Sequence, residues 1–71
     1  MNKDFGDFIR KLREEQNLTQ KELAEKSGFT VVQIKNIERG KNIPRVFNLG
    51  KLANALNCDF DYLYERIIYN D

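Results

Sequence analysis

The chain has 71 residues, room for one small domain, because folding at this size buries only about 60% of the unfolded chain's surface. It contains 12 Lys and Arg, 11 Asp and Glu, no His and one Cys. The missing His excludes Ser-His-Asp and Cys-His relays and imidazole zinc sites, and one Cys cannot form an internal disulfide. No apolar run approaches the roughly 18 residues of a membrane span, and the polar start is unlike a signal peptide. We therefore expect a cytoplasmic protein that is not an enzyme and has no metal or cofactor.

The net charge of +1 is unevenly distributed along the chain. Residues 1–30 carry six basic and six acidic side chains, whereas residues 31–51 carry five basic against one acidic, a net charge of +4. Residues 52–71 carry one basic against four acidic side chains, a net charge of −3. A nucleic-acid-binding domain needs a basic patch rather than a basic total. The middle segment is the candidate for such a patch, although many charge runs are only solvated faces.

Apolar residues at helical spacing predict helices throughout. The first apolar stripe comprises Phe5, Phe8, Ile9 and Leu12. Asp4 is expected to cap this helix, and Asn17 to end it, since Asn tolerates the left-handed backbone conformation. By the same reasoning, Asn57 is expected to end the fourth helix, and Asp59 is expected to cap the start of the fifth. The pattern predicts one all-α domain over residues 1–71, with helices at about 5–16, 20–27, 31–39, 46–56 and 60–68.

A very short turn separates the second and third of these helices. Thr19 and Glu22 form a capping box that starts the second helix, and Gly28 ends it after about two turns. Thr30 then caps the third helix, which Gly40 closes. This arrangement is a helix–turn–helix, a corner that also occurs in proteins that do not bind DNA.

The outward side of the third helix carries side chains suited to DNA. At about 100° per residue, the apolar pair Ile34 and Ile37 marks its inward side. The opposite side comprises Val32, Lys35, Asn36 and Arg39, with Gln33 on its flank. Lys suits guanine or phosphate, Asn and Gln suit adenine, and Arg at the helix end suits phosphate. Val32, next to Val31, is either a tolerated surface residue or a contact to thymine methyl groups, and we favour the contact.

Together these elements resemble the phage-repressor and Cro type of helix–turn–helix protein, the XRE family. The resemblance covers about residues 5–64 and rests on Leu18–Gly28, Ile34, Ile37–Lys41, Pro44, Leu52–Leu56 and Asp61–Leu63. It implies a compact five-helix, lambda-repressor-like domain that binds double-stranded DNA. A member of this family acts as a transcriptional regulator, typically a repressor at a pseudo-palindromic operator. No small-molecule ligand is expected.

The resemblance also implies a role for individual residues, with the third helix in the major groove. The residues expected to read bases are Val31, Val32, Gln33, Lys35 and Asn36. The residues expected to contact phosphates are Thr19, Gln20, Thr30, Arg39, Lys41 and Arg45. Arg13 and Glu38 are expected to form a buried ion pair that ties the first helix to the third. The alternative is two unrelated surface charges, and we favour the pair because Glu38 lies on the inward side of its helix. Relatives place polar residues at positions 31 and 32 and often a capping Ser at position 45, so their base code does not transfer.

The C-terminal helix carries the expected dimer contact. Tyr64, Ile67 and Ile68 are the candidates, because a thin core benefits from a partner and repressor-type proteins bind as homodimers. The alternative is a slightly apolar terminal turn. Cys58 is expected to be a buried structural thiol, and Phe29 and Phe47 to be packing residues, Phe47 with some exposure.

A second function remains open from the sequence. A protein-interaction module, or an antitoxin that binds a toxin as well as DNA, could use the same helical scaffold to dock a partner protein. A complex that is insensitive to salt would favour this alternative, because phosphate contacts make DNA binding strongly salt-dependent.

Overall fold

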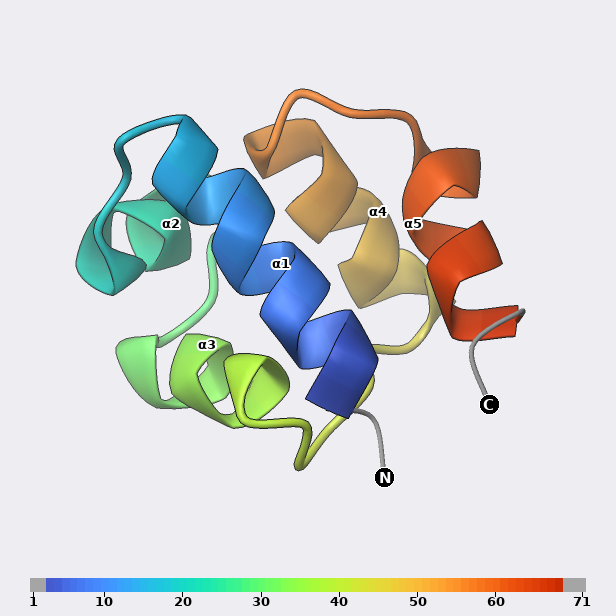
Figure 1. The fold of residues 1–71 in the computed structure, drawn as a ribbon. Coiled ribbons are helices and arrows are strands. Elements are labelled where there is room, and N and C mark those ends of the chain that lie inside the picture. Colours follow the sequence, from blue (N-terminus) through green and yellow to red (C-terminus); the bar gives the residue numbers. More distant parts are fainter. Residues whose placement is uncertain (1–2, 69–71) are drawn as a thin grey trace.

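A computed structural model describes residues 3–68 of the chain, and five helices account for most of them (Figure 1). The helices are α1 (Lys3–Glu15), α2 (Gln20–Ser27), α3 (Val31–Glu38), α4 (Val46–Ala55) and α5 (Phe60–Ile68). No strand occurs in residues 3–68, so the all-α, five-helix prediction is confirmed. Within the same range, no helix combines the length and the apolar character that a membrane crossing requires.

The predicted helix bounds differ from the observed ones by one or two residues, chiefly at the ends of α1, α3 and α4. The prediction that Asp4 caps α1 is wrong, because Asp4 lies inside the first turn of this helix. Lys3 and Asp7 form an exposed i,i+4 pair at 3.6 Å across that turn. A carboxylate in the first turn is still favourable, since it faces the positive end of the helix dipole.

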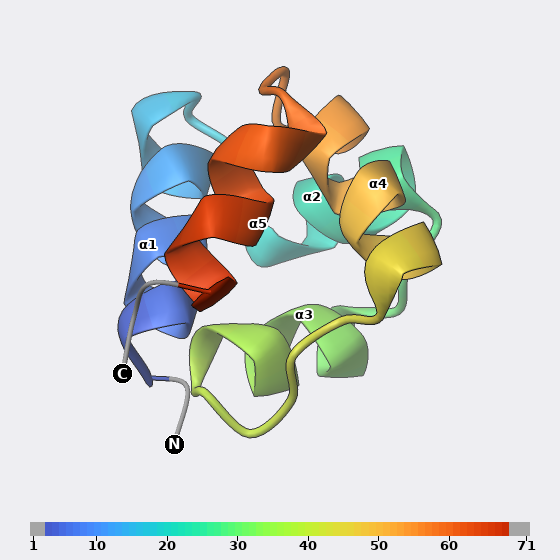
Figure 2. The same ribbon diagram turned by 90° about the vertical axis from the view of Figure 1, so that its right-hand side faces the viewer.

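The helices pack around one apolar core, with α1 against α3, α2 against both α3 and α4, and α4 against α5 (Figures 1 and 2). The buried apolar residues are Phe5, Ile9, Leu23, Ala24, Ile34, Ile37, Leu49, Leu52, Ala53, Ala55, Leu56 and Leu63. Helix α5 contributes only Leu63 to this set, with Phe60 and Ile67 partly buried beside it. The first four helices therefore hold most of the core, and α5 covers one side of it.

Left-handed residues end the helices as predicted. Gly28 after α2 has φ +80°, and its N–H donates to the carbonyl of Ala24. Gly40 after α3 has φ +79°, and Asn17 and Asn57 have φ values of 59° and 55°. Each lies beyond the end of its helix and redirects the chain, so the connections stay short.

Gly6 lets α1 approach the end of α3 more closely than a side chain would allow. A Cβ atom at Gly6 would lie 2.5 Å from the carbonyl oxygen of Glu38 and 2.6 Å from that of Ile37. Real Cβ atoms essentially never come so near to another heavy atom. This contact sets the distance between α1 and the last turn of α3.

Candidate nucleic-acid interface

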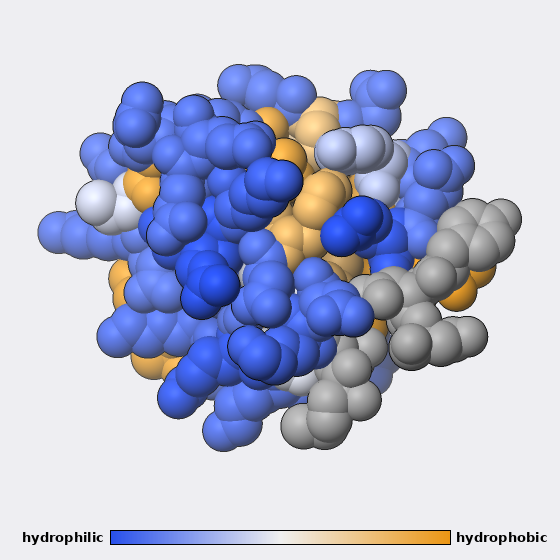
Figure 3. All heavy atoms as spheres, in the orientation of Figure 1, coloured by the Kyte–Doolittle hydropathy of each residue, from blue (hydrophilic) through white to orange (hydrophobic). Residues whose placement is uncertain are grey.

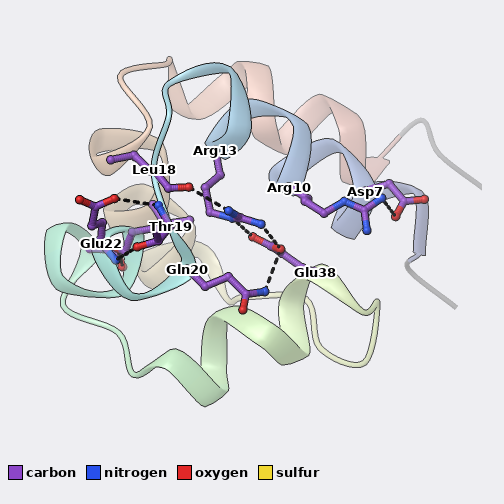
Figure 4. Close-up of polar contacts among 10 residues, drawn as sticks. Asp7, Arg10, Arg13, Leu18, Thr19, Gln20, Glu22 and Glu38 are labelled. Carbon is purple, nitrogen blue, oxygen red and sulfur yellow. Dashed lines mark hydrogen bonds and ion pairs between the residues drawn. The ribbon is translucent and has the colours of Figure 1, made fainter.

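Helices α2 and α3 each begin with a reciprocal pair of hydrogen bonds. At α2, the Thr19 hydroxyl oxygen accepts the Glu22 N–H at 3.0 Å, and the Glu22 carboxylate accepts the Thr19 N–H at 2.8 Å (Figure 4). At α3, Thr30 and Gln33 make the same two bonds at 3.1 and 2.8 Å. The first box confirms the prediction at Thr19. Sequence reasoning missed the role of Gln33 in the second, although Thr-x-x-Gln fits the capping-box pattern.

A buried ion pair joins α1 to the last turn of α3. Arg13 Nε and Nη2 donate to the two carboxylate oxygens of Glu38 at 2.6 and 3.0 Å, and Arg13 Nη1 donates to the Leu18 carbonyl at 2.8 Å (Figure 4). The two charged side chains are only 10% and 4% exposed. The hydrogen bond to Glu38 raises the pKa of Arg13 above its usual value. The expected pair is thus present, and its two-pronged geometry fixes the orientation of α3 against α1.

Gln20, the first residue of α2, also contacts this ion pair. Its Nε2 donates to Glu38 Oε1 at 3.1 Å (Figure 4). The Glu38 carboxylate therefore accepts hydrogen bonds from α1 and from α2, which satisfies a charge that would be costly to bury alone. One N–H of the Gln20 amide is used in this way, which leaves the second N–H available for a further contact.

The outward side of α3 forms a polar surface that we call the reading face. It consists of Val32, Gln33, Lys35, Asn36 and Arg39. Val32 is 64% exposed, whereas Val31 packs partly against the core, so only one of the two valines projects freely. Asn36 is half-buried, and its Oδ1 accepts a hydrogen bond from Arg39 Nη2 at 3.2 Å. Inward, Ile34 and Ile37 are buried as predicted.

A hollow with a cationic rim lies between α1, α2 and the reading face. Arg10, Lys35 and Arg39 line it together with Gln20 and the Arg13–Glu38 pair. Because Glu38 is neutralised by Arg13, the three other cations dominate the charge there. Arg10 also lies 3.3 Å from Asp7, in an exposed pair of the kind that contributes little. Sequence reasoning missed Arg10, although its place three residues before Arg13 puts it on the same side of α1.

The other residues expected to contact phosphates are the N-cap residues of α2, α3 and α4 and one residue just after α3. Thr19, Thr30, Lys41 and Arg45 are exposed. The hydroxyl oxygens of both threonines accept capping bonds, and each hydroxyl hydrogen can still donate. Arg45 occupies the N-cap position of α4 without a side-chain capping bond, as expected from the departure at position 45. In the view of Figure 3, the surface over α1 and α3 is mostly hydrophilic.

An apolar surface lies over α4 and the start of α5, which run side by side (Figure 2). We call it the α4–α5 surface, and it is lined by Val46, Phe47, Gly50, Lys51, Asn54 and Phe60. The Lys51 ammonium lies 4.9 Å from the centroid of the Phe47 ring. Phe47 is 75% exposed, so the prediction that it is a packing residue is wrong. The inward side of α4 is already filled by Leu49 and Leu52, which leaves Phe47 outside. The rings of Phe60 and Tyr64 stack with their centroids 5.5 Å apart.

The three dimer candidates differ in exposure. Tyr64 is 40% and Ile68 46% exposed, whereas Ile67 is half-buried and packs against the core. Phe29 is also partly buried against the core, in agreement with its expected packing role. Cys58 packs against the core as well but is half-buried, less than the buried thiol that was expected.

Two capped helices joined by a left-handed glycine, with the second one docked by a buried ion pair, define a helix–turn–helix unit. The chain belongs to the helix-turn-helix family: the family model HTH_3, described as Helix-turn-helix, matches residues 9–63.

Curated relatives of this chain include several proteins described as transcriptional regulators. It is 39% identical over 66 residues to the HTH-type transcriptional repressor RghR of Bacillus subtilis (strain 168), covering 92% of this chain and 49% of that protein. It is 31% identical to the ImmF control region 10 kDa protein of Bacillus phage phi105, covering 86% of this chain and 68% of the phage protein. The chain thus spans about half the length of RghR.

Among solved structures, the restriction-modification controller protein C.AhdI from Aeromonas hydrophila superposes with a TM-score of 0.81 at 34% identity. The match covers 86% of this chain and 88% of the controller protein. The five-helix arrangement is therefore shared over nearly the whole of a protein of similar size.

Proposed function

We propose that the chain binds double-stranded DNA in a sequence-specific way and regulates transcription, as a repressor that occupies a pseudo-palindromic operator. The observation that carries this proposal is that α3 is fixed at both ends by contacts within the protein while its outward side is exposed to solvent. The capping box at Thr30 holds its start, and the Arg13–Glu38 pair holds its last turn. A rigid helix with a polar outer side suits the major groove. The names of the relatives support the same role.

We assign affinity and specificity to different side chains. The phosphate contacts are Thr19, Gln20, Thr30, Arg39, Lys41 and Arg45, to which the hollow adds Arg10. The base contacts are Val32, Lys35 and Asn36 in the groove, with Val31 and Gln33 at its edge. Phosphate contacts set the register on the duplex, and base contacts select the sequence.

Fluorescence anisotropy on a duplex selected from a random library tests this proposal. Each phosphate contact contributes about −0.9 to the slope of log K against log salt concentration. Lys41→Ala is therefore expected to weaken binding to all duplexes and to flatten the slope by about one unit. Asn36→Ala should cost roughly 1–3 kcal/mol on the selected duplex and little on random DNA. Absence of duplex binding at low salt would refute the proposal, and a salt-insensitive complex with a protein would favour an interaction module or antitoxin.

We further propose a homodimer, with Tyr64 and Ile68 in the contact and Ile67 supporting them from the core side. Exposed aromatic and aliphatic side chains at the end of α5 favour such a contact, and a two-fold pair would match operator half-sites about one helical turn apart. Light scattering after size-exclusion chromatography measures the mass. A strict monomer at high concentration, unchanged by operator DNA, would refute this contact. We also propose that the protein acts in the cytoplasm, where its DNA partner would be reached.

A further inference from the structure

The amide oxygens of the reading face are already engaged within the protein. Gln33 Oε1 accepts the backbone N–H of Thr30 at 2.8 Å, and Asn36 Oδ1 accepts from Arg39 Nη2 at 3.2 Å. A peptide N–H and a guanidinium can only donate, so the group that each amide turns to its partner is the oxygen. The nitrogen of each amide, a donor, is the end that remains for an outside contact.

The other polar groups of the reading face are donors as well. Lys35 carries an ammonium group, and Arg39 has further N–H groups beyond the one on Asn36. The acidic residue of α3, Glu38, is buried in its ion pair with Arg13 and is not part of the reading face. The face therefore presents N–H donors next to the methyl groups of Val32, and each of its amide oxygens already accepts one hydrogen bond from within the protein.

We infer that the reading face selects the acceptor edges of guanine and thymine, and that Arg39 enforces this choice through Asn36. This inference rests on the proposed DNA-binding function. In the major groove, guanine offers O6 and N7 and thymine offers O4, all acceptors, whereas cytosine offers an amino donor and adenine a donor beside its acceptor N7. A donor-only face matches the first two bases and leaves the amino groups of the others without a partner.

Asn36 is the residue at which the inferred preference for guanine or thymine differs from the usual pairing of Asn with adenine. Asn commonly reads adenine with both ends of its amide, the oxygen accepting from N6 and the nitrogen donating to N7. Here Arg39 holds the oxygen, and an adenine amino group placed on its second lone pair would lie next to the positive guanidinium. Adenine thus loses one of its two bonds, while guanine or thymine can still accept from the amide nitrogen. Arg39 is accordingly a specificity-positioning residue in addition to a phosphate contact.

Selection from a random duplex library, run in parallel with four forms of the intact protein, tests this inference. The forms are the wild type, Asn36→Ala, Arg39→Ala and Lys41→Ala. The position at which Asn36→Ala loses its preference identifies the base that Asn36 contacts. Lys41→Ala is the matched control, because it also removes one exposed cation near the end of α3 but leaves the Asn36 side chain untouched. Lys41 bonds to Asn36 through the backbone alone, its N–H donating to the Asn36 carbonyl oxygen at 2.9 Å, and alanine keeps this bond. All three substituted side chains are exposed or half-exposed, so the fold should persist.

At that position the wild type and Lys41→Ala are expected to prefer guanine or thymine to adenine by about fivefold or more, the low end for a good base contact. Arg39→Ala frees the amide oxygen, so adenine should gain by about the same factor, and the gain should vanish in the Arg39→Ala, Asn36→Ala double variant. Selection of adenine by the wild type at this position overturns the inference but leaves the proposed function standing. An unchanged preference in Arg39→Ala, or no position affected by Asn36→Ala, overturns it too. Enrichment of no duplex at all would overturn both.

Discussion

Two glycines in helices, Gly6 and Gly50, should respond to the same substitution in opposite directions. In a helix, Gly→Ala gains about 0.5–1 kcal/mol when the new methyl group has room. At Gly50 it has room, because no atom outside the adjoining residues and the backbone of its own helix lies within 4 Å of the Cβ position. Gly50→Ala should therefore raise the free energy of unfolding by about 0.5–1 kcal/mol.

At Gly6 the methyl group meets backbone that cannot rotate away. Its Cβ would lie 2.5 Å from the Glu38 carbonyl oxygen, whereas ordinary contact begins at 3.4 Å, so α1 and α3 must separate by nearly 1 Å. Such overpacking typically costs about 1–3 kcal/mol, and a shift of α1 also strains the 2.6 Å bond between Arg13 and Glu38. After the helix gain is subtracted, Gly6→Ala should lower the free energy of unfolding by about 1–2 kcal/mol.

Urea and thermal unfolding followed by circular dichroism, at one protein concentration, measure both variants. The lower stability of Gly6→Ala corresponds to a fall in Tm of about 5–10 °C for a domain of this size, and Gly50→Ala should raise Tm by a few degrees. If both variants shift in the same direction by the same amount, or if Gly6→Ala is as stable as the wild type, the close approach of α1 to α3 is refuted.

Three further predictions concern the ion pair, the start of α4 and the thiol. Glu38→Gln leaves the Arg13 guanidinium buried without its counter-charge and should lower the free energy of unfolding by about 3 kcal/mol. Urea titration measures this loss, and a loss under about 1 kcal/mol would contradict the stabilising role of the ion pair. Arg45→Ser supplies the missing cap and should stabilise the fold by about 0.5–1 kcal/mol while weakening DNA binding; a cap that leaves the urea midpoint unchanged would count against this. Burial, with a smaller effect from Asp59, raises the pKa of Cys58, so iodoacetamide should modify the folded protein more slowly than the unfolded one at pH 8. A raised thiol pKa also means that its contribution to stability persists below the ordinary value of 9.0 and is lost as the pH rises above it.

Features governed by local chemistry could be predicted from the sequence. Thr19 and Thr30 cap their helices, and Gly28 and Gly40 adopt left-handed backbone, because these properties depend on residues within one turn. Helical periodicity alone also predicted which side of α3 faces the core. The Arg13–Glu38 pair was different, since nothing local joins residues 25 positions apart, and only the family resemblance suggested it.

Features that depend on packing between helices could not be predicted. Gly6 reads as an ordinary helix-weakening glycine until α3 is placed against it. Phe47 is large and apolar, yet the inward positions of α4 were already occupied. Val31 was assigned to base reading together with Val32, but it packs partly against the core. The bond from Arg39 to Asn36 depends on the direction of two long side chains, which spacing does not determine.

The three-way contact at Glu38 bears on how this recognition element could be transplanted. Helices α2 and α3 with their turn look like a segment that could be moved as a unit, because the capping residues and the glycine lie within the segment itself. Without α1, however, the Glu38 carboxylate in this segment would lose its two hydrogen bonds from Arg13 and keep only the one from Gln20. The smallest unit that can be grafted onto another scaffold therefore begins upstream of Arg13, and a recipient without an equivalent cation would have to change position 38 as well.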